Sequence, residues 1–533
     1  MSTEATDPST DKAVTDTAKM SSVHDLTAQI VQIRSGATTA EELVSASLDL
    51  ADRVNDRVGA ILERFDESAL AAGRSAEHSA GPLAGLPLGI KANIAVSEAV
   101  PTSQSRVFDP EFHCGRDAEA VARLRAADGV IMGATTMVEH AAGRPDPALD
   151  FPIPRNPWDL SRWPGGSSCG TAIAVSLGII SAGLGTDTSG SCRIPAAFCG
   201  VTGMRPAMGS LPMDGIMPAA PSLDIVGPIA RSARDCRLLL EVMRGQTVGS
   251  SRRGRTVRVV VPEQALGSTR ITHDTAAAFD EVLSTLEALG VETSTVDVPY
   301  LDELIAATLT IMVREMYEVH SDRLAPRWND YGRSFRRLAL AGALVTDDTY
   351  QAALNSAGVL RGRLSELLPN GTALALPTWP SAAPPYVFRG GTPQDDWNLT
   401  AAFSATGNPA LAIPMGFDEA GLPLSLQLIG SGPEASGSEN IAAGATGPEA
   451  NGTAGEDSIL SLGELYQTHT DHHLQVPDFD LITALALIPD SDEGVDAVGE
   501  EPQLPPQITD LGIPLTRADS VMLGHLIALL GAP

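Results

Sequence analysis

Apolar residues recur along the chain at two different spacings, which alternate from one stretch to the next. In residues 39–51 the apolar positions lie three or four residues apart, which predicts an amphipathic helix. Thr39 and Glu42 have the spacing of a capping box, so the helix should begin at Thr39. The helical pattern begins at His24, and the helix that starts at Thr39 is predicted to have one face in a core.

The alternation of helix and strand continues downstream. Residues 117–128 are predicted to form a helix with Asp117 as N-cap, and the apolar run 130–135 is predicted to be a strand. Strands interleaved with helices favour an α/β architecture with a parallel or mixed sheet. The same reasoning predicts strands over 256–261, 291–298, 374–377, 411–415 and 424–429, and helices over 274–289 and within 300–370.

Composition divides the chain into a long globular region and three polar segments. Residues 1–22 are rich in Thr, Ser and Asp and are predicted to be a disordered tail, followed by one domain over 23–479. Residues 431–457 are rich in Gly, Ala, Ser and Glu without apolar periodicity, which predicts a surface insertion, followed by a helix over 459–474. Residues 480–533 are an acidic, Pro-rich extension in which a terminal helix could form over 517–530.

The overall charge excludes some partners. A net charge of −30 argues against direct binding of nucleic acid, which needs clustered Lys and Arg. No apolar run approaches the roughly 18 to 20 residues of a membrane span. The five cysteines lack CxxC pairs and metal-finger spacing, and the first residues lack the pattern of a signal peptide. We therefore expect a cytoplasmic protein without a membrane partner.

Two Gly/Ser-rich turns carry the candidate chemistry. Residues 163–171 and 185–195 flank the short apolar segment 172–184, so their hydroxyl groups should return to one place. A nucleophilic serine needs a tight turn, nearby backbone N–H groups and a proton acceptor. Lys91 directly follows an apolar strand segment, which is unusual unless its amine has a function.

Several motifs give these turns a family context. The segments 85–96, 164–170 and 185–200 resemble the lysine segment, the Gly/Ser-rich loop and the nucleophile loop of the amidase signature family. Ser167 and Ser191 stand at the family's interval of 24 residues. Shorter stretches of the same resemblance are 133–139, 155–159, 222–228, 403–409 and 421–430. The resemblance covers roughly residues 24–479 and implies a large mixed β-sheet core with helices on both faces.

The resemblance also implies a mechanism. Ser191 would be the nucleophile, Ser167, after a cis peptide bond, the proton relay, and Lys91 the base, neutral because burial lowers its pKa. The oxyanion would be held by the main-chain N–H groups of Thr188, Ser189, Gly190 and Ser191. An acyl-enzyme would form, and no metal or cofactor is expected.

Four residues depart from the family's usual pattern. Cys169 and Thr171 replace residues that are usually Gly and Ser, and Ala92 replaces a common Asp. Ser189 stands where Gly is usual, and a positive φ at this residue would strain the oxyanion loop. None of the four departures removes Lys91, Ser167 or Ser191.

Other candidate groups have a simpler interpretation. Cys169 and Cys192 are expected to be buried thiols rather than nucleophiles, and Asp187 and Arg193 are expected to fix the loop. The three histidines near the end of the predicted helix 459–474 are expected to lie on one solvated helix face rather than to bind metal. They are His469, His472 and His473.

We therefore expect an amidase that hydrolyses a small non-peptide carboxamide, with no partner beyond this substrate except a second copy in a homodimer. Two alternatives remain. One is the glutaminase subunit of an aminoacyl-tRNA amidotransferase, although the helix around Tyr350 resembles that of small-molecule amidases instead. The other is a non-catalytic, amidase-like binding or scaffold protein, for which Cys169, Ser189 and the extension 480–533 argue.

Overall fold

A computed structural model describes residues 24–77, 80–250, 258–386, 397–433 and 453–478, together with parts of 504–523. Its strands are β1 Ile61–Arg64, β2 Pro87–Lys91, β3 Val130–Thr135, β4 Ala182–Asp187, β5 Thr202–Arg205, β6 Ile225–Ala230, β7 Arg258–Pro262, β8 Glu292–Val296, β9 Thr372–Pro377, β10 Ala410–Phe417 and β11 Pro423–Ile429. Its helices are α2 Leu26–Ser35, α3 Ala40–Val58, α4 Asp66–Ala76, α5 Glu119–Ala126, α6 Cys169–Leu177, α7 Arg193–Cys199, α8 Ala233–Met243, α9 His273–Ala288, α10 Leu301–Leu324, α11 Arg333–Ala341, α12 Asp347–Leu367, α13 Thr453–Gln467 and α14 Pro506–Thr509. Short 3₁₀ turns are η1 Glu139–Ala141, η2 Trp328–Asp330, η3 Gly342–Leu344, η4 Ala401–Phe403 and η5 His472–Leu474.

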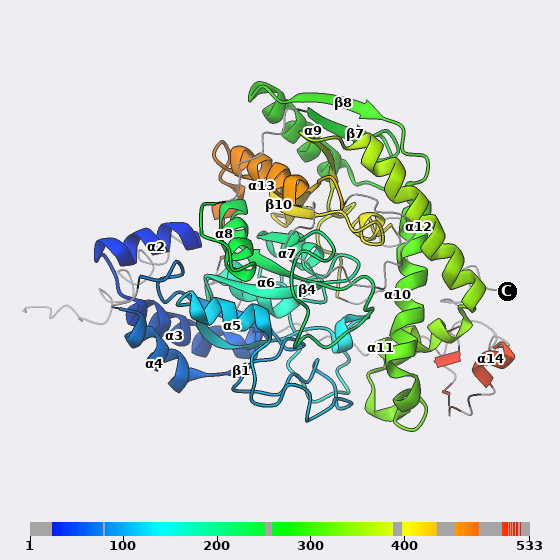
Figure 1. Ribbon diagram of the computed structural model, residues 1–533, viewed down its shortest axis with the longest axis horizontal. Coiled ribbons are helices and arrows are strands. Elements are labelled where there is room, and N and C mark those ends of the chain that lie inside the picture. Colours follow the sequence, from blue (N-terminus) through cyan, green and yellow to red (C-terminus); the bar gives the residue numbers. More distant parts are fainter. Residues whose placement is uncertain are drawn as a thin grey trace, which may run out of the picture.

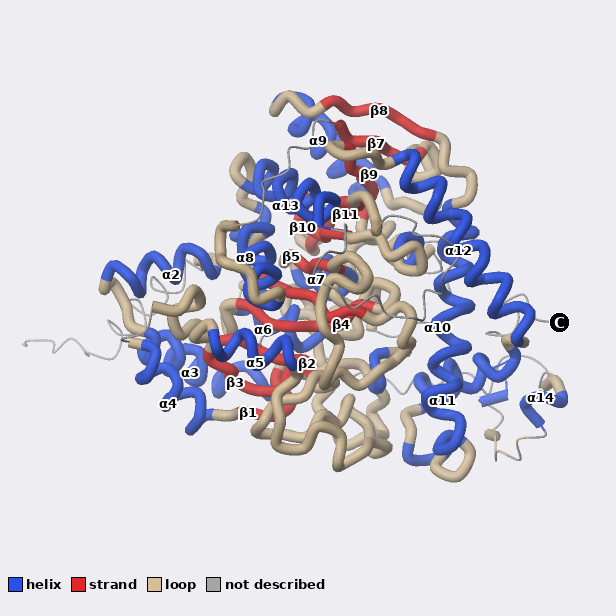
Figure 2. Tube along the Cα trace, viewed as in Figure 1, coloured by secondary structure: helices blue, strands red, loops and turns tan. Residues whose placement is uncertain are grey.

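In the described residues the strands form one sheet of 11, in the order β1-β3-β2-β4-β6-β5-β10-β11-β9-β7-β8. Strands β3, β2 and β4 are parallel neighbours, and so are β9, β7 and β8, whereas β6, β5, β10 and β11 join these two groups through antiparallel pairs. The sheet is therefore mixed, as expected. The sheet runs through the molecule from β1, low in the view, to β8 at its upper edge, with helices on either side (Figure 2).

Helices cover both faces of this sheet because the side chains of each strand alternate between two cores. In β7, Val259 and Val261 belong to the core formed with α5, α8, α9 and α13, whereas Val260 belongs to the core formed with α10 and α12. In β3, Ile131 and Met132 divide in the same way, with Met132 packing toward α3 and α6. The predicted arrangement of helices on both faces is confirmed.

Helices α10, α11 and α12 form one flank of the molecule (Figure 1). The described parts of the C-terminal segment, including α14, lie beside α11 in the same view. Ile508 and Leu523 from this segment are buried in a cluster with Trp328, Tyr331 and Phe335. This segment is thus packed on the α10 and α11 flank.

The structure corrects several predicted boundaries. Helix α5 begins at Glu119 rather than after Asp117, whose carboxylate instead accepts a hydrogen bond from the Ser97 N–H at 2.8 Å. Helix α13 begins at Thr453, so the last five residues of the predicted insertion 431–457 belong to a helix. The rest of that insertion from 434, the tail 1–22 and most of the terminal helix 517–530 lie outside the described residues.

The three histidines do not share a helix face, so that prediction is wrong. Helix α13 ends at Gln467, which leaves His469 beyond the helix and His472 in η5. His473 is buried, and burial lowers its pKa to about 4. In the described ranges, no group of three or more His, Cys, Asp or Glu side chains is placed to hold a metal ion.

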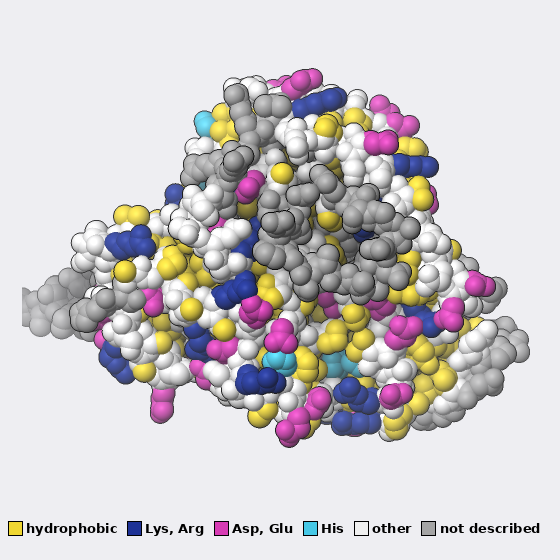
Figure 3. Space-filling model, in the orientation of Figure 1, with side chains coloured by type: hydrophobic (Ala, Val, Ile, Leu, Met, Phe, Trp, Pro, Cys, Tyr) yellow, Lys and Arg dark blue, Asp and Glu magenta, His cyan; other side chains and the backbone are white. Residues whose placement is uncertain are grey.

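Three further features concern the charged surface, the exposure of the cysteines and the apolar character of the helices. On the face shown in Figure 3, Lys and Arg side chains are dispersed among Asp and Glu. Of the cysteines, Cys114 is exposed, and the buried ones are Cys169, Cys192, Cys199 and Cys236. A helix with the length and apolar character needed to cross a lipid bilayer does not occur in the described part of the chain.

Candidate active site

The edge where two parallel strands end brings the predicted lysine to the predicted relay serine. Lys91 is the last residue of β2, and β4 runs parallel beside it, with Ile90 opposite Leu184. The Lys91 Nζ donates hydrogen bonds of 2.7 Å to Ser167 Oγ and 2.7 Å to Thr186 Oγ1. The amine is thus fixed between the Gly/Ser-rich loop and the end of β4.

The two Gly/Ser-rich turns meet, as their sequence predicts. The peptide bond between Gly166 and Ser167 is cis, which agrees with the expected geometry of Ser167. One residue further, the Ser168 N–H donates a 3.1 Å hydrogen bond to the carbonyl oxygen of Ser191. Ser167 and Ser191 are 3% and 7% exposed, so both hydroxyl groups lie in a nearly closed site.

The environment of Lys91 favours its neutral form. The side chain is fully buried, and this burial lowers its pKa from 10.5 to about 8. The carboxylates of Asp224 and Asp187 act in the opposite direction and keep the pKa from falling further. Near neutral pH a useful fraction of this lysine can therefore accept a proton.

The loop between β4 and α7 exposes backbone donors beside Ser191. Among the described residues, the N–H groups of Thr188, Ser189 and Ser191 have no acceptor. The Gly190 N–H instead donates to Asp187 Oδ1 at 2.9 Å. In this structure the Gly190 N–H therefore closes the loop, and its part as an oxyanion donor stays a prediction.

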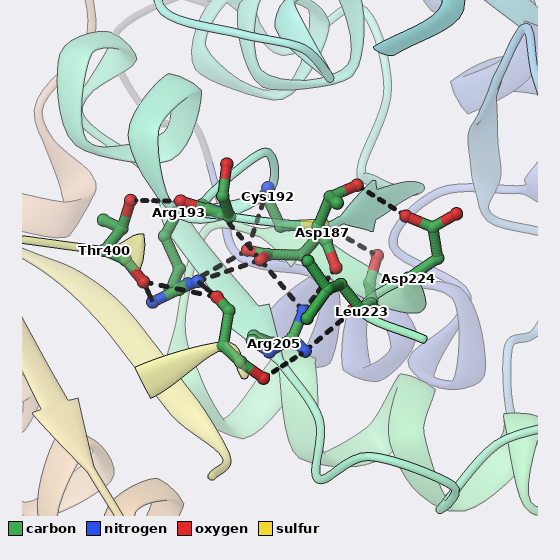
Figure 4. A network of polar contacts seen from close by, with 12 residues as sticks. Asp187, Cys192, Arg193, Arg205, Leu223, Asp224 and Thr400 are labelled. Carbon is green, nitrogen blue, oxygen red and sulfur yellow. Dashed lines mark hydrogen bonds and ion pairs between the residues drawn. The ribbon is translucent and has the colours of Figure 1, made fainter. Parts of the chain in front are cut away.

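A buried ion-pair network holds this loop in place (Figure 4). The Arg193 guanidinium donates to both carboxylate oxygens of Asp187, at 3.0 and 2.9 Å, and Arg205 lies 3.3 Å from the same carboxylate. Burial alone would raise the pKa of Asp187, but the two guanidinium groups hold it well below its ordinary value. The loop-fixing role predicted for Asp187 and Arg193 is confirmed.

Three of the four positions that depart from the usual family pattern, Ser189, Thr171 and Cys169, are accommodated. Positive φ angles among the described residues include Gly190 at 130° but not Ser189, so the serine carries no backbone strain. Thr171 Oγ1 lies 2.6 Å from Thr135 Oγ1 and also donates to the Leu184 carbonyl. Cys169 is buried, and burial raises the pKa of its thiol to about 12, as it does for Cys192. Both thiols are buried and un-ionised, as predicted.

Three polar residues at the site were not assigned from the sequence. Thr186 Oγ1 accepts hydrogen bonds from Lys91 and from Asn93 Nδ2, the latter at 3.2 Å. Asp224 accepts a 2.6 Å hydrogen bond from Thr188 Oγ1, and burial raises the pKa of its carboxyl to about 6. For Asn93 and Asp224 the available signal was a polar side chain flanked by apolar residues, since buried polar groups require partners.

Comparison with known proteins identifies the family of this chain. Residues 42–434 match the family described as Amidase. The protein AmiD of Mycobacterium tuberculosis (strain ATCC 25618 / H37Rv), which carries the name of an amidase, is 31% identical over 425 residues, covering 75% of this chain and 88% of AmiD. A glutamyl-tRNA(Gln) amidotransferase subunit of Roseiflexus castenholzii (strain DSM 13941 / HLO8) is 30% identical over 493 residues, covering 83% of this chain and 95% of that protein. A crystal structure of an amidase superposes with a TM-score of 0.73 at 30% identity, covering 84% of this chain and all of that one.

Fold, site and relatives together define an enzyme that hydrolyses amide bonds. More narrowly, the chain belongs to the amidase signature family.

Proposed function

We propose that this enzyme hydrolyses the C–N bond of a small non-peptide carboxamide to a carboxylate and ammonia or an amine, with Ser191 as nucleophile. The observation that carries the proposal is the 2.7 Å contact of the fully buried Lys91 Nζ with Ser167 Oγ, beside the loop that bears Ser191. A buried amine with a pKa of about 8 can act as a base at neutral pH.

The proposed reaction uses Lys91, Ser167 and Ser191 in turn. Neutral Lys91 takes the proton of Ser167, which in turn takes the proton of Ser191 as Ser191 Oγ attacks the substrate carbonyl carbon. The proton then returns through Ser167 to the leaving nitrogen, and the C–N bond breaks to leave an acyl-enzyme. Water attacks the ester, its proton follows the same route, and Ser191 is released.

The developing oxyanion would be held by the main-chain N–H groups of Thr188, Ser189 and Ser191. One such donor stabilises the transition state by about 2.7–4 kcal/mol. The hydrogen bond between Thr188 and Asp224 fixes one end of this loop. At its other end the Asp187 and Arg193 pair keeps Gly190 turned inward.

A fluorophosphonate probe tests the proposal without knowledge of the natural substrate. The wild-type protein should be labelled on Ser191, S191A should not be labelled, and K91A should lose labelling while keeping its far-UV circular dichroism. The exposed serine variant S161A is the control and should label like wild type. Absence of wild-type labelling, together with no ammonia release from aliphatic, aryl and ureido amides, would overturn the proposal.

A second candidate is the glutaminase component of an amidotransferase. It is favoured by the 30% identity to the Roseiflexus castenholzii protein over 83% of this chain. The two candidates differ in substrate and in partner. Ammonia release from glutamine that depends on a co-purifying second chain would favour the amidotransferase component, whereas turnover of simple amides by the single chain would exclude it. The non-catalytic alternative loses one of its arguments, since Ser189 is unstrained.

A further inference from the structure

The C-terminal segment is anchored on α11 by a buried charge cluster. The Asp519 side chain is fully buried and accepts a 2.7 Å hydrogen bond from Arg337 Nε. The Arg336 guanidinium lies 3.3 Å from the same carboxylate, and Thr516 donates its N–H to it at 3.0 Å. Since the nearby Ile508 and Leu523 are also buried, this segment is part of the folded domain.

The N-terminal end of α11, one turn before Arg336 and Arg337, holds the loop of residues 138–146. The Gly332 N–H, just before the helix, donates to Glu139 Oε2 at 2.7 Å. Ser334 Oγ accepts from the Arg144 N–H at 2.9 Å. A third contact is a two-point ion pair in which Arg333 donates to Asp146 at 2.7 and 3.0 Å. The position of α11 therefore determines the position of this loop.

The same loop touches the proposed relay serine. At its start, the Val138 N–H donates a 3.1 Å hydrogen bond to the carbonyl oxygen of Ser167. Toward its end, the Arg144 guanidinium lies 3.6 Å from the centre of the Trp163 ring. A Cβ on Gly166 would lie only 2.8 Å from Val138 and 3.4 Å from Trp163. The loop thus packs directly against the peptide that precedes Ser167.

We define the C-terminal strap as the described residues within 504–523. From these contacts we infer that the strap, acting through α11, positions the loop of residues 138–146 and thereby Ser167. Asp519 and Ser334 are then positioning residues for Ser167. The inference rests on the proposed function, in which Ser167 relays the proton. The strap contacts no reacting group. It fixes α11, which fixes residues 138–146, which in turn fix the Ser167 carbonyl.

Full-length variants test this inference. D519N removes the charge at the anchor. S334A removes one of the three links between α11 and the loop, the hydrogen bond from the Arg144 N–H. D457N is the matched control, because Asp457 forms a similarly sheltered ion pair with Arg237, at 2.9 Å, between α13 and α8. Two readouts are compared at a temperature where every variant is folded. They are the rate of fluorophosphonate labelling of Ser191 and hydrogen–deuterium exchange of peptides covering 138–146.

We expect labelling of D519N and S334A to slow by about tenfold, because small misplacements of catalytic groups cost large factors in rate. Exchange of Val138 and Arg144 should become faster in both variants. D457N should lower the melting temperature yet label within about twofold of wild type, since distant sites act independently. The double variant D519N/S334A should label no more slowly than the slower single variant, because both substitutions interrupt the same route from the strap through α11 to residues 138–146.

The inference is overturned if folded D519N labels at the wild-type rate, or if exchange rises in α11 but not in 138–146. If D519N does not fold, S334A alone decides by the same two readouts. If the wild-type protein is not labelled at all, the proposed function fails, whereas the exchange comparison still decides on the strap. Faster exchange at 138–146 then supports the strap, and unchanged exchange overturns it.

Discussion

At the scale of single residues, Lys91 combines a chemical advantage with a cost in stability. Its amine lies in a fully buried position at the end of β2, where Ser167 and Thr186 are its hydrogen-bond partners. The burial that lowers its pKa to about 8 is also what makes the proton-accepting form available. The same burial penalises the folded state whenever the amine is protonated.

The rate of acyl-enzyme formation should therefore depend on pH through Lys91. Below a pH of about 8 most of the amine is protonated and only a minority can accept a proton. The fluorophosphonate labelling rate should therefore rise with pH and level off above about 9. Measurement of the labelling rate from pH 6 to 9.5 checks this expectation. A rate that is independent of pH over this range would contradict the role of Lys91 as base.

Replacing Lys91 with methionine should abolish activity and stabilise the fold at pH 7. The fall in pKa from 10.5 to about 8 corresponds to about 3 kcal/mol of penalty, from which about 1 kcal/mol for each lost hydrogen bond is subtracted. A net gain of about 1–2 kcal/mol should be visible in urea denaturation. Because the unfolded chain binds the proton more tightly, the penalty is complete below pH 8 and fades between pH 8 and 10.5, and so should the gain.

At the scale of elements, the connection between β4 and α7 decides which backbone groups face the substrate. Gly190 adopts a φ of 130°, which turns its N–H inward to Asp187. A Cβ at this position would collide with the side chain of Thr400. One glycine in this loop is thus required, whereas the neighbouring Ser189 replaces a glycine without strain.

Two neighbouring substitutions should therefore behave oppositely. G190A should lose fluorophosphonate labelling and destabilise the fold by about 1–3 kcal/mol, since the new methyl group has no space and an unfavourable φ. S189G should label at a rate close to that of wild type. Thermal unfolding and labelling of both variants check the pair. Wild-type behaviour of G190A would show that the loop is not held as described.

At the scale of the whole molecule, the Asp187 network joins the two halves of the sheet. Asp187 ends β4, and its partner Arg193 also donates to the Gln427 side chain on β11 at 2.6 Å and to the Thr400 carbonyl at 2.8 Å. Arg205, on β5 between these strands, donates to the same aspartate. One carboxylate therefore ties the N-terminal and C-terminal parts of the sheet together behind the active site.

D187N should destabilise the entire fold rather than one loop. Removing one partner from a buried ion pair costs about 3–5 kcal/mol, because the remaining guanidinium charges stay buried. The free energy of unfolding in urea should fall by this amount, with labelling of Ser191 lost as well. D150N, which removes the exposed partner of Arg106, should leave the urea midpoint unchanged. A small effect of D187N would contradict the central role of this pair.

The spacing of apolar residues predicted an element well where the residues of that element determine its bounds locally. Strand β7 and helix α9 agree with the predicted 256–261 and 274–289 to within two residues, and the capping box of Thr39 and Glu42 is present. Helix α13 was predicted to begin at Ile459 because the residues before it are polar. In the structure it begins at Thr453, and the buried Glu456 in its first turn forms an ion pair with Arg244. Local pattern cannot reveal such a distant partner.

The site was predictable in part for a similar reason. Lys91, Ser167 and Ser191 were found through their motifs, and the structure brings Lys91 and Ser167 into contact. Two contacts of the loop could not be predicted, because they depend on how it folds back on itself. In one the Gly190 N–H donates to Asp187, and in the other the Thr188 hydroxyl donates to Asp224. The link from Asp519 to α11 spans 182 residues of chain and has no sequence motif.

The reactivity of the cysteine thiols can report how far a molecule has unfolded. Of five cysteines, only Cys114 is exposed, and the other four are buried in the two central cores and around the active site. A maleimide reagent should attach to one thiol per folded molecule and to five in denaturant. Mass spectrometry of the adducts would then give the fraction of unfolded molecules. In a molecule with two or three adducts, the identity of the labelled cysteines would show which core becomes accessible first.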